Sequence, residues 1–210
     1  MKRILDVVVS ALGLFCLAPL FAVVALLVRW EDGGRVFFRQ RRVGRDGKPF
    51  EIYKFRTMRP AAGTVITAAG DSRITRTGRW LRRWKLDELP QLWNVLRGEM
   101  SLVGPRPEIP EFVRLYSPEA REVLRVRPGI TGPSQLVGFD EEEELRQAAD
   151  PERYYRDVIL PRKLETDLLY VRGSGLSTDL RILWNTARRA LGVWKVPRSL
   201  SGQRLRGGSR

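Results

Sequence analysis

Two adjacent carboxylates, Asp87 and Glu88, are the residues of this chain best suited to chemistry on a charged substrate. Pro90 follows them and suits the first turn of a helix, and Gly98 suits its end. The apolar residues of the segment recur at helical spacing, namely Leu89, Leu92, Trp93 and Leu96. This pattern predicts a helix with both carboxylates at its N-terminal end, where the dipole favours their ionised form. The alternative interpretation is an ordinary helix cap.

Basic residues surround this pair in the sequence. Four of them come just before it, namely Arg79, Arg82, Arg83 and Lys85. After it, residues 101–107 are predicted to form a rigid loop that presents Arg106 between two prolines. Carboxylate oxygens bind Mg²⁺, and cationic side chains neutralise phosphate oxygens. The context therefore favours a site for a metal-bound diphosphate over a simple helix cap.

A β-hairpin is predicted upstream of the pair. Residues 36–38 have the composition of a short strand, Asp46-Gly47 is a strong turn signal, and residues 50–56 form a second strand. Lys54 and Arg56 lie two positions apart, so their side chains share one face of that strand. They are either a clamp for phosphate oxygens or part of a solvated face.

Composition limits the chemistry that the chain can perform. Its 210 residues hold 38 Lys and Arg against 24 Asp and Glu, a net charge of +14 that indicates an anionic partner: nucleic acid, acidic lipid or a phosphorylated substrate. There is no histidine, which excludes Ser-His-Asp triads, HExxH zinc sites and histidine phosphotransfer. Cys16 is the only cysteine, so an intramolecular disulfide or zinc cluster is excluded. Catalysis must use carboxylates, Lys or Arg, hydroxyls or an oxygen-bound metal.

The N-terminal segment predicts membrane attachment. Residues 7–28 carry no charged side chain, and as a straight helix they would be about 33 Å long, enough to cross the hydrocarbon core of a bilayer. This run is too long for the core of a signal peptide, and no small-residue cleavage site follows it. Pro19 stands in its middle and predicts a kink, because proline removes a backbone hydrogen bond.

Basic residues at both ends of this segment predict its topology. Lys2 and Arg3 precede it, and Arg29, Arg35 and Arg39 follow it. The positive-inside rule then places both ends on the cytoplasmic side. A helix-break-helix over residues 1–30, which enters one leaflet and returns, satisfies that rule. A single-span signal anchor is the alternative.

Further elements are predicted along the chain. Residues 59–75 have the composition of a loop over the site. Residues 77–85 form a helix on which Trp80 and Trp84 lie four apart, either packed in the core or anchored at a membrane interface.

The C-terminal half is predicted to be mainly helical. Residues 110–125 and 151–170 have helical patterns, with a turn-rich passage at 127–133 between them. The acidic run 140–144 begins a helix on the surface. Apolar residues between 180 and 194 recur at helical spacing and either pack on the domain or lie in a membrane surface.

Several motifs in fixed order resemble one family, the bacterial sugar transferases, which are monotopic polyprenyl-phosphate phosphoglycosyl transferases. The motifs are Lys2-Arg3 with Asp6, VFFRQRRVG (36–44), KFRTM (54–58), LDELPQLWNV (86–95), MSLVGPRPE (100–108) and RPGITG (127–132). The likeness runs from residue 2 to about residue 191. A long ordered set of this kind is far more specific than any one motif.

The resemblance implies an activity and roles for individual residues. Members transfer a sugar 1-phosphate from a UDP-sugar to undecaprenyl phosphate, with Mg²⁺, and release UMP; this step begins exopolysaccharide, O-antigen or capsule synthesis. Asp87 corresponds to the nucleophile, which forms an aspartyl phosphosugar, and Glu88 to its partner carboxylate at the metal. Cationic positions near the diphosphate and nucleotide correspond to Lys54, Arg56, Arg82 and Arg106, the last of these between Pro105 and Pro107.

The resemblance also implies a location. The family's N-terminal helix is re-entrant and places the catalytic domain on the cytoplasmic face of the bacterial inner membrane, so the lipid bilayer is a partner and nucleic acid is not. A homodimer is left open. The chain departs from the family at Ala18, where a serine often precedes the proline, and residues 133–137 lack a common tryptophan. Both departures lie away from Asp87 and Glu88 in the sequence.

The predicted fold is α+β, with a mostly helical, compact cytoplasmic domain, a short β-hairpin and an N-terminal re-entrant membrane helix. Residues 1–30 form the membrane segment, 31–194 the catalytic domain and 195–210 a basic flexible tail. One rival is a membrane-anchored nucleic-acid binder, which leaves the Asp87–Glu88 pair without a role. The other is a non-catalytic scaffold, in which Asp87→Asn would be silent.

Overall fold

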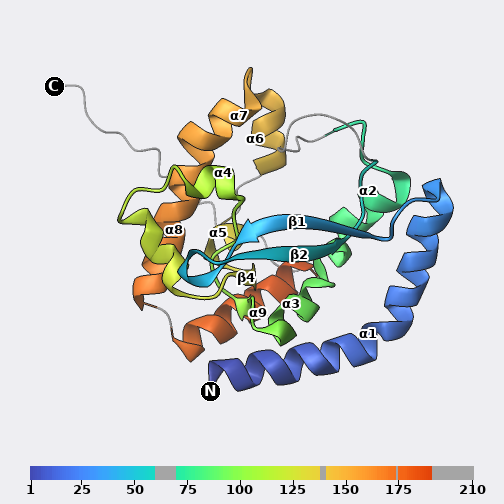
Figure 1. The fold of residues 1–210 in the computed structure, drawn as a ribbon, viewed down its shortest axis with the longest axis horizontal. Coiled ribbons are helices and arrows are strands. Elements are labelled where there is room, and N and C mark those ends of the chain that lie inside the picture. Colours follow the sequence, from blue (N-terminus) through green and yellow to red (C-terminus); the bar gives the residue numbers. More distant parts are fainter. Residues whose placement is uncertain (60–69, 138–140, 174, 191–210) are drawn as a thin grey trace.

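The structure is a computed structural model that describes residues 1–59, 70–137, 141–173 and 175–190 (Figure 1). A long helix, α1 (Lys2–Asp32), runs along the outside of a mostly helical domain with two small sheets. The other described α-helices are α2 (Arg76–Arg83), α3 (Gln91–Arg97), α4 (Pro110–Val113), α5 (Pro133–Leu136), α6 (Glu141–Gln147), α7 (Pro151–Tyr154), α8 (Leu160–Gly173) and α9 (Leu176–Ala190). The predicted mixed, mostly helical class is confirmed. Most of the loop predicted at 59–75 and all of the tail 195–210 lie outside the described residues.

The predicted hairpin is confirmed. Strands β1 (Phe37–Val43) and β2 (Pro49–Phe55) pair in antiparallel fashion, with Phe37 opposite Phe55 and Val43 opposite Pro49. A short 3₁₀ turn joins them, in which Asp46 and Gly47 both have positive φ. The first strand ends at Val43 rather than at the predicted residue 38, because it is held by pairing with β2 while most of its side chains stay exposed.

A second sheet lies where only turns were predicted. Strands β3 (Ser101–Val103) and β4 (Gly129–Thr131) pair in parallel, with Ser101 opposite Gly129. A Cβ atom on Gly129 would lie 2.1 Å from the backbone nitrogen of Gly104, so the close approach of the two backbones requires glycine. The loop predicted at 101–107 is therefore wrong where β3 forms, and the turns predicted at 127–133 are wrong where β4 forms.

Helix α1 is continuous over 31 residues, with Pro19 inside it, and Figure 1 shows that it bends part-way along. Proline cannot donate the backbone hydrogen bond of a helix interior, which gives the bend a physical cause. One limb packs through Leu14 and Leu17, and the other through Val24 and Val28. Only 11% of its most apolar 18-residue window is buried, at a mean hydropathy of 2.7. Helix α1 is therefore long and apolar enough to cross a membrane, and it is not a buried core helix.

Polar contacts tie the first turn of α1 to the domain. The Lys2 ammonium group donates to the Val103 carbonyl oxygen at 2.9 Å, to the Tyr170 hydroxyl at 3.0 Å and to Asp179 at 2.7 Å. The buried Asp6 carboxylate accepts from the Ser101 hydroxyl and the Leu102 N–H. These contacts join α1 to β3, α8 and α9.

The last turn of α1 is tied to the same domain. Glu31 accepts hydrogen bonds from the backbone N–H groups of Arg76 and Thr77, which begin α2. Asp32 forms an ion pair with Arg56, just beyond β2. Both ends of the bent helix are therefore fixed to one body.

Two helical predictions in the C-terminal half are corrected. The single helix predicted at 110–125 is wrong: α4 ends at Val113, and a separate 3₁₀ segment follows from Ala120 to Arg125. Pro118 lies between them and cannot donate a helical hydrogen bond. Residues 151–170 are helical as predicted, although a π-helical segment, Tyr155–Ile159, joins α7 to α8.

The predicted apolar face of the last helix packs only in part, since Leu183 lies against the buried cluster that includes Ile182. Asp179 and Ile182 of α9 are buried, whereas Leu180 and Trp184 are 51% and 65% exposed. Trp80 of α2 and Trp84, which caps the end of that helix, are also about half exposed, so core packing does not explain their spacing. Helix α6 begins in the acidic run as predicted, with Asp140 outside the described residues.

Candidate active site

Asp87 and Glu88 lie in a separate 3₁₀ turn, Leu86–Glu88, between α2 and α3. Lys85 opens this turn with a left-handed φ of 56°. Pro90 occupies the cap position of α3, and Gly98 ends that helix with positive φ, as predicted. The carboxylates therefore lie at the N-terminal end of α3 as predicted, in a turn of their own just before the helix rather than in its first turn. Both side chains are largely buried.

Glu88 lies between two cations that come from different parts of the chain. Its Oε1 atom accepts hydrogen bonds from the Lys54 ammonium group at 2.7 Å and from the Arg106 guanidinium at 2.8 Å. Burial acts to raise the pKa of Glu88, but the charges of Arg106 and Lys54 outweigh it and hold that pKa well below its usual value. Glu88 is therefore ionised and paired.

Asp87 has the opposite environment. Burial raises the pKa of its carboxyl group above the usual value, the neighbouring charge of Glu88 raises it further, and Lys54, Lys85 and Arg82 act against the rise. Its Oδ1 atom is buried and has no hydrogen-bond partner among the described residues. Desolvation, rather than the helix dipole or the nearby basic residues, has the largest effect on this pKa. An unpaired, desolvated carboxylate oxygen is a competent nucleophile.

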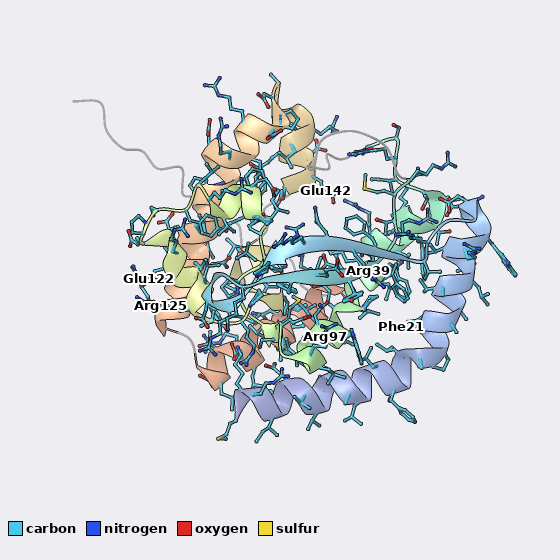
Figure 2. All side chains as sticks on the ribbon, in the orientation of Figure 1. Phe21, Arg39, Arg97, Glu122, Arg125 and Glu142 are labelled. Carbon is cyan, nitrogen blue, oxygen red and sulfur yellow. The ribbon has the colours of Figure 1, made fainter. Side chains whose placement is uncertain are left out.

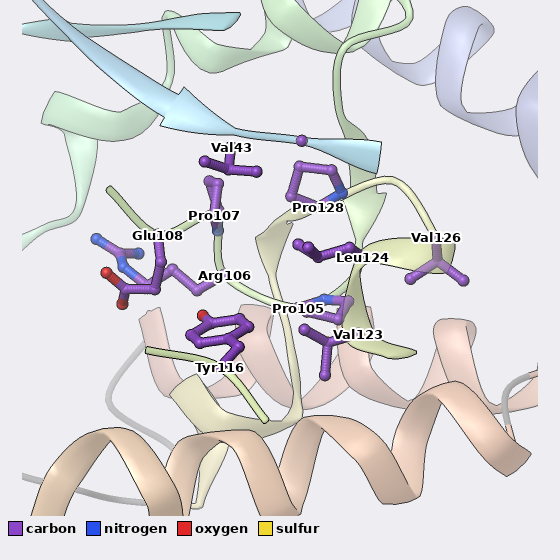
Figure 3. Close-up of a pocket in the computed structure, with 11 residues that line it drawn as sticks. Val43, Pro105, Arg106, Pro107, Glu108, Tyr116, Val123, Leu124, Val126 and Pro128 are labelled. Carbon is purple, nitrogen blue, oxygen red and sulfur yellow. The ribbon is translucent and has the colours of Figure 1, made fainter. Parts of the chain in front are cut away.

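The Pro105–Pro107 loop holds Arg106 in place. The carbonyl oxygen of Pro105 accepts from the Gly129 N–H at 2.9 Å, and that of Pro107 accepts from Arg42 at 3.0 Å. Beneath the loop is a pocket of about 10 Å³, too small for a substrate (Figure 3). Glu88 is the main cause of a raised pKa at Arg106, so this side chain stays cationic. The loop therefore presents a fixed positive charge to Glu88.

Arg56 does not join Lys54 on Glu88. The Arg56 guanidinium is paired with Asp32 at the end of α1, at 3.0 Å for one of its nitrogens. A Cβ atom on Gly34 would lie 2.4 Å from the same guanidinium, so the chain after α1 passes directly over it. The predicted pair on one strand face is thus divided between two carboxylates.

Arg82 of α2 contacts a third carboxylate. Its guanidinium pairs with Glu142 of α6, which is labelled in Figure 2. Its charge still acts on Asp87, although no direct contact between the two is formed. Hydrogen bonds therefore bring together Lys54, Glu88 and Arg106 beside Asp87, whereas Arg56 and Arg82 pair with acidic residues of α1 and α6.

Sequence reasoning missed a buried polar cluster behind the Pro105–Pro107 loop. Glu108 accepts hydrogen bonds from the Tyr155 hydroxyl and from Lys163 at 3.3 Å, and Arg42 lies 3.6 Å away. Lys163 also contacts Glu141 at 3.2 Å. Glu108 stands in a motif of the sequence, but Tyr155 and Lys163 carry no signal that separates them from surface residues of a helix.

The carboxylate pair fits a magnesium ion. Mg²⁺ takes one or two carboxylates, completes its shell with substrate phosphate oxygens and water, and needs no closed cage. Asp87 Oδ1 offers an acceptor without a donor in the described part of the chain, and Glu88 stands next to it. A group of three or more potential ligands is not found among residues 1–59, 70–137, 141–173 and 175–190, so phosphate oxygens would have to supply the remaining contacts.

Comparison with known proteins gives a consistent result. The family model described as "Bacterial sugar transferase" matches residues 1–192. An exopolysaccharide production protein, ExoY, of Sinorhizobium fredii is 38% identical over 203 residues, which cover 88% of this chain and 83% of the relative. A UDP-glucose:undecaprenyl-phosphate glucose-1-phosphate transferase of Xanthomonas campestris is 41% identical over 199 residues, covering 91% of this chain and 39% of the relative.

A third relative is named for a different sugar. A UDP-N-acetylgalactosamine-undecaprenyl-phosphate N-acetylgalactosaminephosphotransferase of Aeromonas hydrophila is 37% identical over 197 residues, covering 90% of this chain and 43% of the relative. The chain therefore spans less than half the length of the relatives from Xanthomonas and Aeromonas, and most of the length of ExoY.

Proposed function

The chain belongs to the bacterial sugar transferase family, and we propose that it transfers a sugar 1-phosphate from a UDP-sugar to undecaprenyl phosphate and releases UMP. The observation that carries the proposal is the difference in environment between the adjacent carboxylates Asp87 and Glu88. Asp87 is desolvated and has an unpaired oxygen, while Glu88 is held by Lys54 and Arg106. Groups with such different environments serve different roles in one reaction.

In the first half of the reaction, an oxygen of the Asp87 carboxylate attacks the sugar-side phosphorus of the donor. A P–O bond to Asp87 forms, the bond from that phosphorus to the bridging oxygen breaks, and UMP leaves with the electron pair. In the second half, an oxygen of undecaprenyl phosphate attacks the same phosphorus, and the Asp87 carboxylate leaves with its electron pair. The covalent aspartyl phosphosugar divides one difficult step into two.

The chain's own residues prepare these steps. Lys54 and Arg106 supply positive charge at the site, which offsets repulsion between Asp87 and the incoming phosphates. Asp87 and Glu88 would hold Mg²⁺ together with donor phosphate oxygens, and the bound ion would supply further stabilisation of the phosphoryl charge. Arg82 and Arg56 would contact the donor only if their carboxylate partners, Glu142 and Asp32, release them.

A re-entrant helix α1 on the cytoplasmic face of the bacterial inner membrane explains the contacts at its two ends. Lys2 and Asp32 are both bound to the same domain, which a span with ends on opposite sides could not satisfy. The outward side of α1 is apolar (Figure 2). Half-exposed tryptophans on other helices suit the interface, namely Trp80, Trp84, Trp93 and Trp184. The site would then lie close to the phosphate of a membrane-bound polyprenol.

The proposed product is the first lipid-linked sugar of an exopolysaccharide or related glycan. Relatives are named for glucose and for N-acetylgalactosamine, so the donor sugar is open and must be tested as a panel. The rival scaffold function gives no role to the unpaired oxygen of Asp87, and a nucleic-acid binder gives none to the Glu88 contacts.

The test is UMP release in nanodiscs with Mg²⁺ and a panel of UDP-sugars, with and without undecaprenyl phosphate. Wild type should release UMP with at least one donor, and Asp87→Asn should not. Intact-protein mass without the acceptor should show a phosphosugar adduct on wild type alone. Asp157→Asn, at an exposed carboxylate, serves as the matched control. Absence of release with every donor, or an active Asp87→Asn, would refute the proposal.

A further inference from the structure

Asn94 is a buried polar residue for which the reaction described above has no role. It lies on α3, six positions after Glu88, and its side chain is fully buried. Its amide makes three hydrogen bonds: Oδ1 accepts from the Tyr53 N–H at 3.1 Å, and Nδ2 donates to the Glu51 carbonyl oxygen at 2.6 Å and to Glu99 at 2.7 Å. Both ends of the amide are thus engaged.

Two of these bonds reach the backbone of β2 at its unpaired edge. The Arg56 N–H bonds to the Val36 carbonyl oxygen of the opposite chain segment. Backbone groups of a strand alternate in direction, so even-numbered residues of β2 face β1, and Glu51 and Tyr53 face away from it. Asn94 therefore bonds to the free edge of β2 as a neighbouring strand would, with a donor and an acceptor at matching positions.

The strand that Asn94 holds carries Lys54. Lys54 follows Tyr53 directly and contacts Glu88, and Glu88 leads through Pro90 into α3, which carries Asn94. The contacts form a closed ring: β2 backbone, Asn94, α3, Glu88, Lys54 and β2 again. A shift of α3 along β2 would break the Asn94 bonds and separate the Lys54 ammonium group from Glu88.

The surroundings make the amide hard to replace. Ile52, Val95 and Met100 form a buried apolar cluster beside it. Hydrogen bonds are stronger in such a dry region, and an unmatched polar group there costs more. A carboxylate at position 94 would direct an acceptor at the Glu51 carbonyl oxygen and at the Glu99 carboxylate, where the amide now directs its donor.

We propose that Asn94 is a positioning residue of the active site, which fixes the register between β2 and α3 and so holds Lys54 on Glu88 beside Asp87. The proposal rests on the proposed function for its kinetic consequence, but the bridge itself is testable without turnover. Asn94 acts through Lys54 and need not touch the substrate.

Residue-resolved hydrogen exchange tests the bridge. In Asn94→Asp and the milder Asn94→Ser, the Tyr53 amide should exchange at least about tenfold faster than in wild type, because exposed strand edges open easily. The Ile52 amide, on the paired edge, should change little. Asn185→Asp, the same substitution on α9, is the matched control and should leave both amides unchanged. Unchanged exchange at Tyr53 in both Asn94 variants would overturn the proposal.

A double-mutant cycle with Lys54→Met tests the functional consequence. Asn94→Asp should lower kcat/KM for the UDP-sugar roughly 100-fold in the wild-type background, as expected for a misplacement of about 1 Å. In the Lys54→Met background, Asn94→Asp should lower kcat/KM by less than about threefold, because the side chain that Asn94 positions is gone. A merely structural role would cost the same factor in both backgrounds, and that result would overturn the proposal.

The two tests separate the possible failures. A wild type that releases no UMP with any donor refutes the proposed function, and the exchange of Tyr53 still decides whether the bridge exists. An active wild type with unchanged Tyr53 exchange in the variants refutes the positioning role alone. If Asn94→Asp does not fold, Asn94→Ser is taken through the same cycle with the same expected pattern.

Discussion

The Lys54 ammonium group lies 2.7 Å from Glu88 Oε1, and this contact joins the hairpin to the turn that carries Asp87. Both partners are mostly buried, with side chains 16% and 15% exposed. A buried ion pair of this kind contributes less to stability than to the placement of charge, because desolvation offsets much of the attraction.

Replacement of Lys54 should therefore impair the reaction. In Lys54→Met, Glu88 keeps only Arg106 of its two cationic partners, and its pKa should rise toward the usual value. We expect kcat/KM for the UDP-sugar to fall by roughly 10²- to 10³-fold, the range for loss of one charge-stabilising group. Lys48→Met, at an exposed lysine of the same hairpin, should match wild type. A kcat/KM of Lys54→Met within about threefold of the wild-type value would contradict the role of Lys54 in stabilising charge at the site.

The cluster behind the Pro105–Pro107 loop predicts a stability effect. Lys163→Met leaves the Glu108 carboxylate buried with fewer cations, and the free energy of unfolding should fall by roughly 3–5 kcal/mol. The double variant Glu108→Gln, Lys163→Met removes both charges and should recover most of that loss. Denaturant titration in mild detergent measures both, with the exposed Arg156→Met as control. Equal losses in the single and double variants would argue against pairing as the cause.

Asp167 predicts a dependence of stability on pH. It is buried on α8 and accepts hydrogen bonds from the N–H and hydroxyl of Ser134. Burial raises its pKa from 3.8 to about 6; the Ser134 hydrogen bonds and Lys163 act against the rise, and Glu108 adds to it.

Because that pKa is raised in the folded state, the folded protein binds the proton more tightly than the unfolded chain does. Stability from this group is present at low pH and is lost as pH rises from about 4 to about 6, by up to about 3 kcal/mol. Asp167→Asn should lack this part of the pH dependence. The melting temperatures of the two proteins between pH 4 and pH 7 check this, and parallel curves would disprove it.

Helix α1 predicts a labelling pattern. In a Cys16→Ser background, one cysteine replaces exposed Arg35 and another is placed in a short tag before Met1. Both should react with an impermeant maleimide in inside-out membrane vesicles, and neither should react in right-side-out vesicles. The reason is that Lys2 and Asp32 are held by the same domain. Labelling of the two cysteines from opposite sides would instead support a signal anchor.

Local signals in the sequence predicted the elements around the site. Asp46-Gly47 set the hairpin, and Gly98 set the end of α3 through its positive φ. These predictions succeeded because turn and cap residues act on their immediate neighbours. Pro118 is a local signal of the same kind, because proline interrupts a helix. The helix predicted at 110–125 ran across it and is therefore wrong.

Local signals could not predict which carboxylate each basic side chain pairs with. Lys54 and Arg56 have the same charge and spacing, yet one pairs with Glu88 and the other with Asp32. The difference follows from where α1 ends in space, which no local pattern records. The raised pKa of Asp87 likewise depends on burial by elements distant in sequence, and the buried cluster joins Glu108 to Lys163 across 55 positions.

The contacts of Lys2 also bear on the order in which the protein is made. Its partners Val103, Tyr170 and Asp179 lie 101, 168 and 177 positions later in the chain. A ribosome therefore releases the most apolar helix of the described chain long before the residues that secure its first turn exist. Until Asp179 has been synthesised, the apolar surface of α1 has to be covered by something other than these later residues, and in the proposed function the bilayer covers it. A chain that stops short of α9 would leave the Lys2 end of that helix without its ion-pair partner.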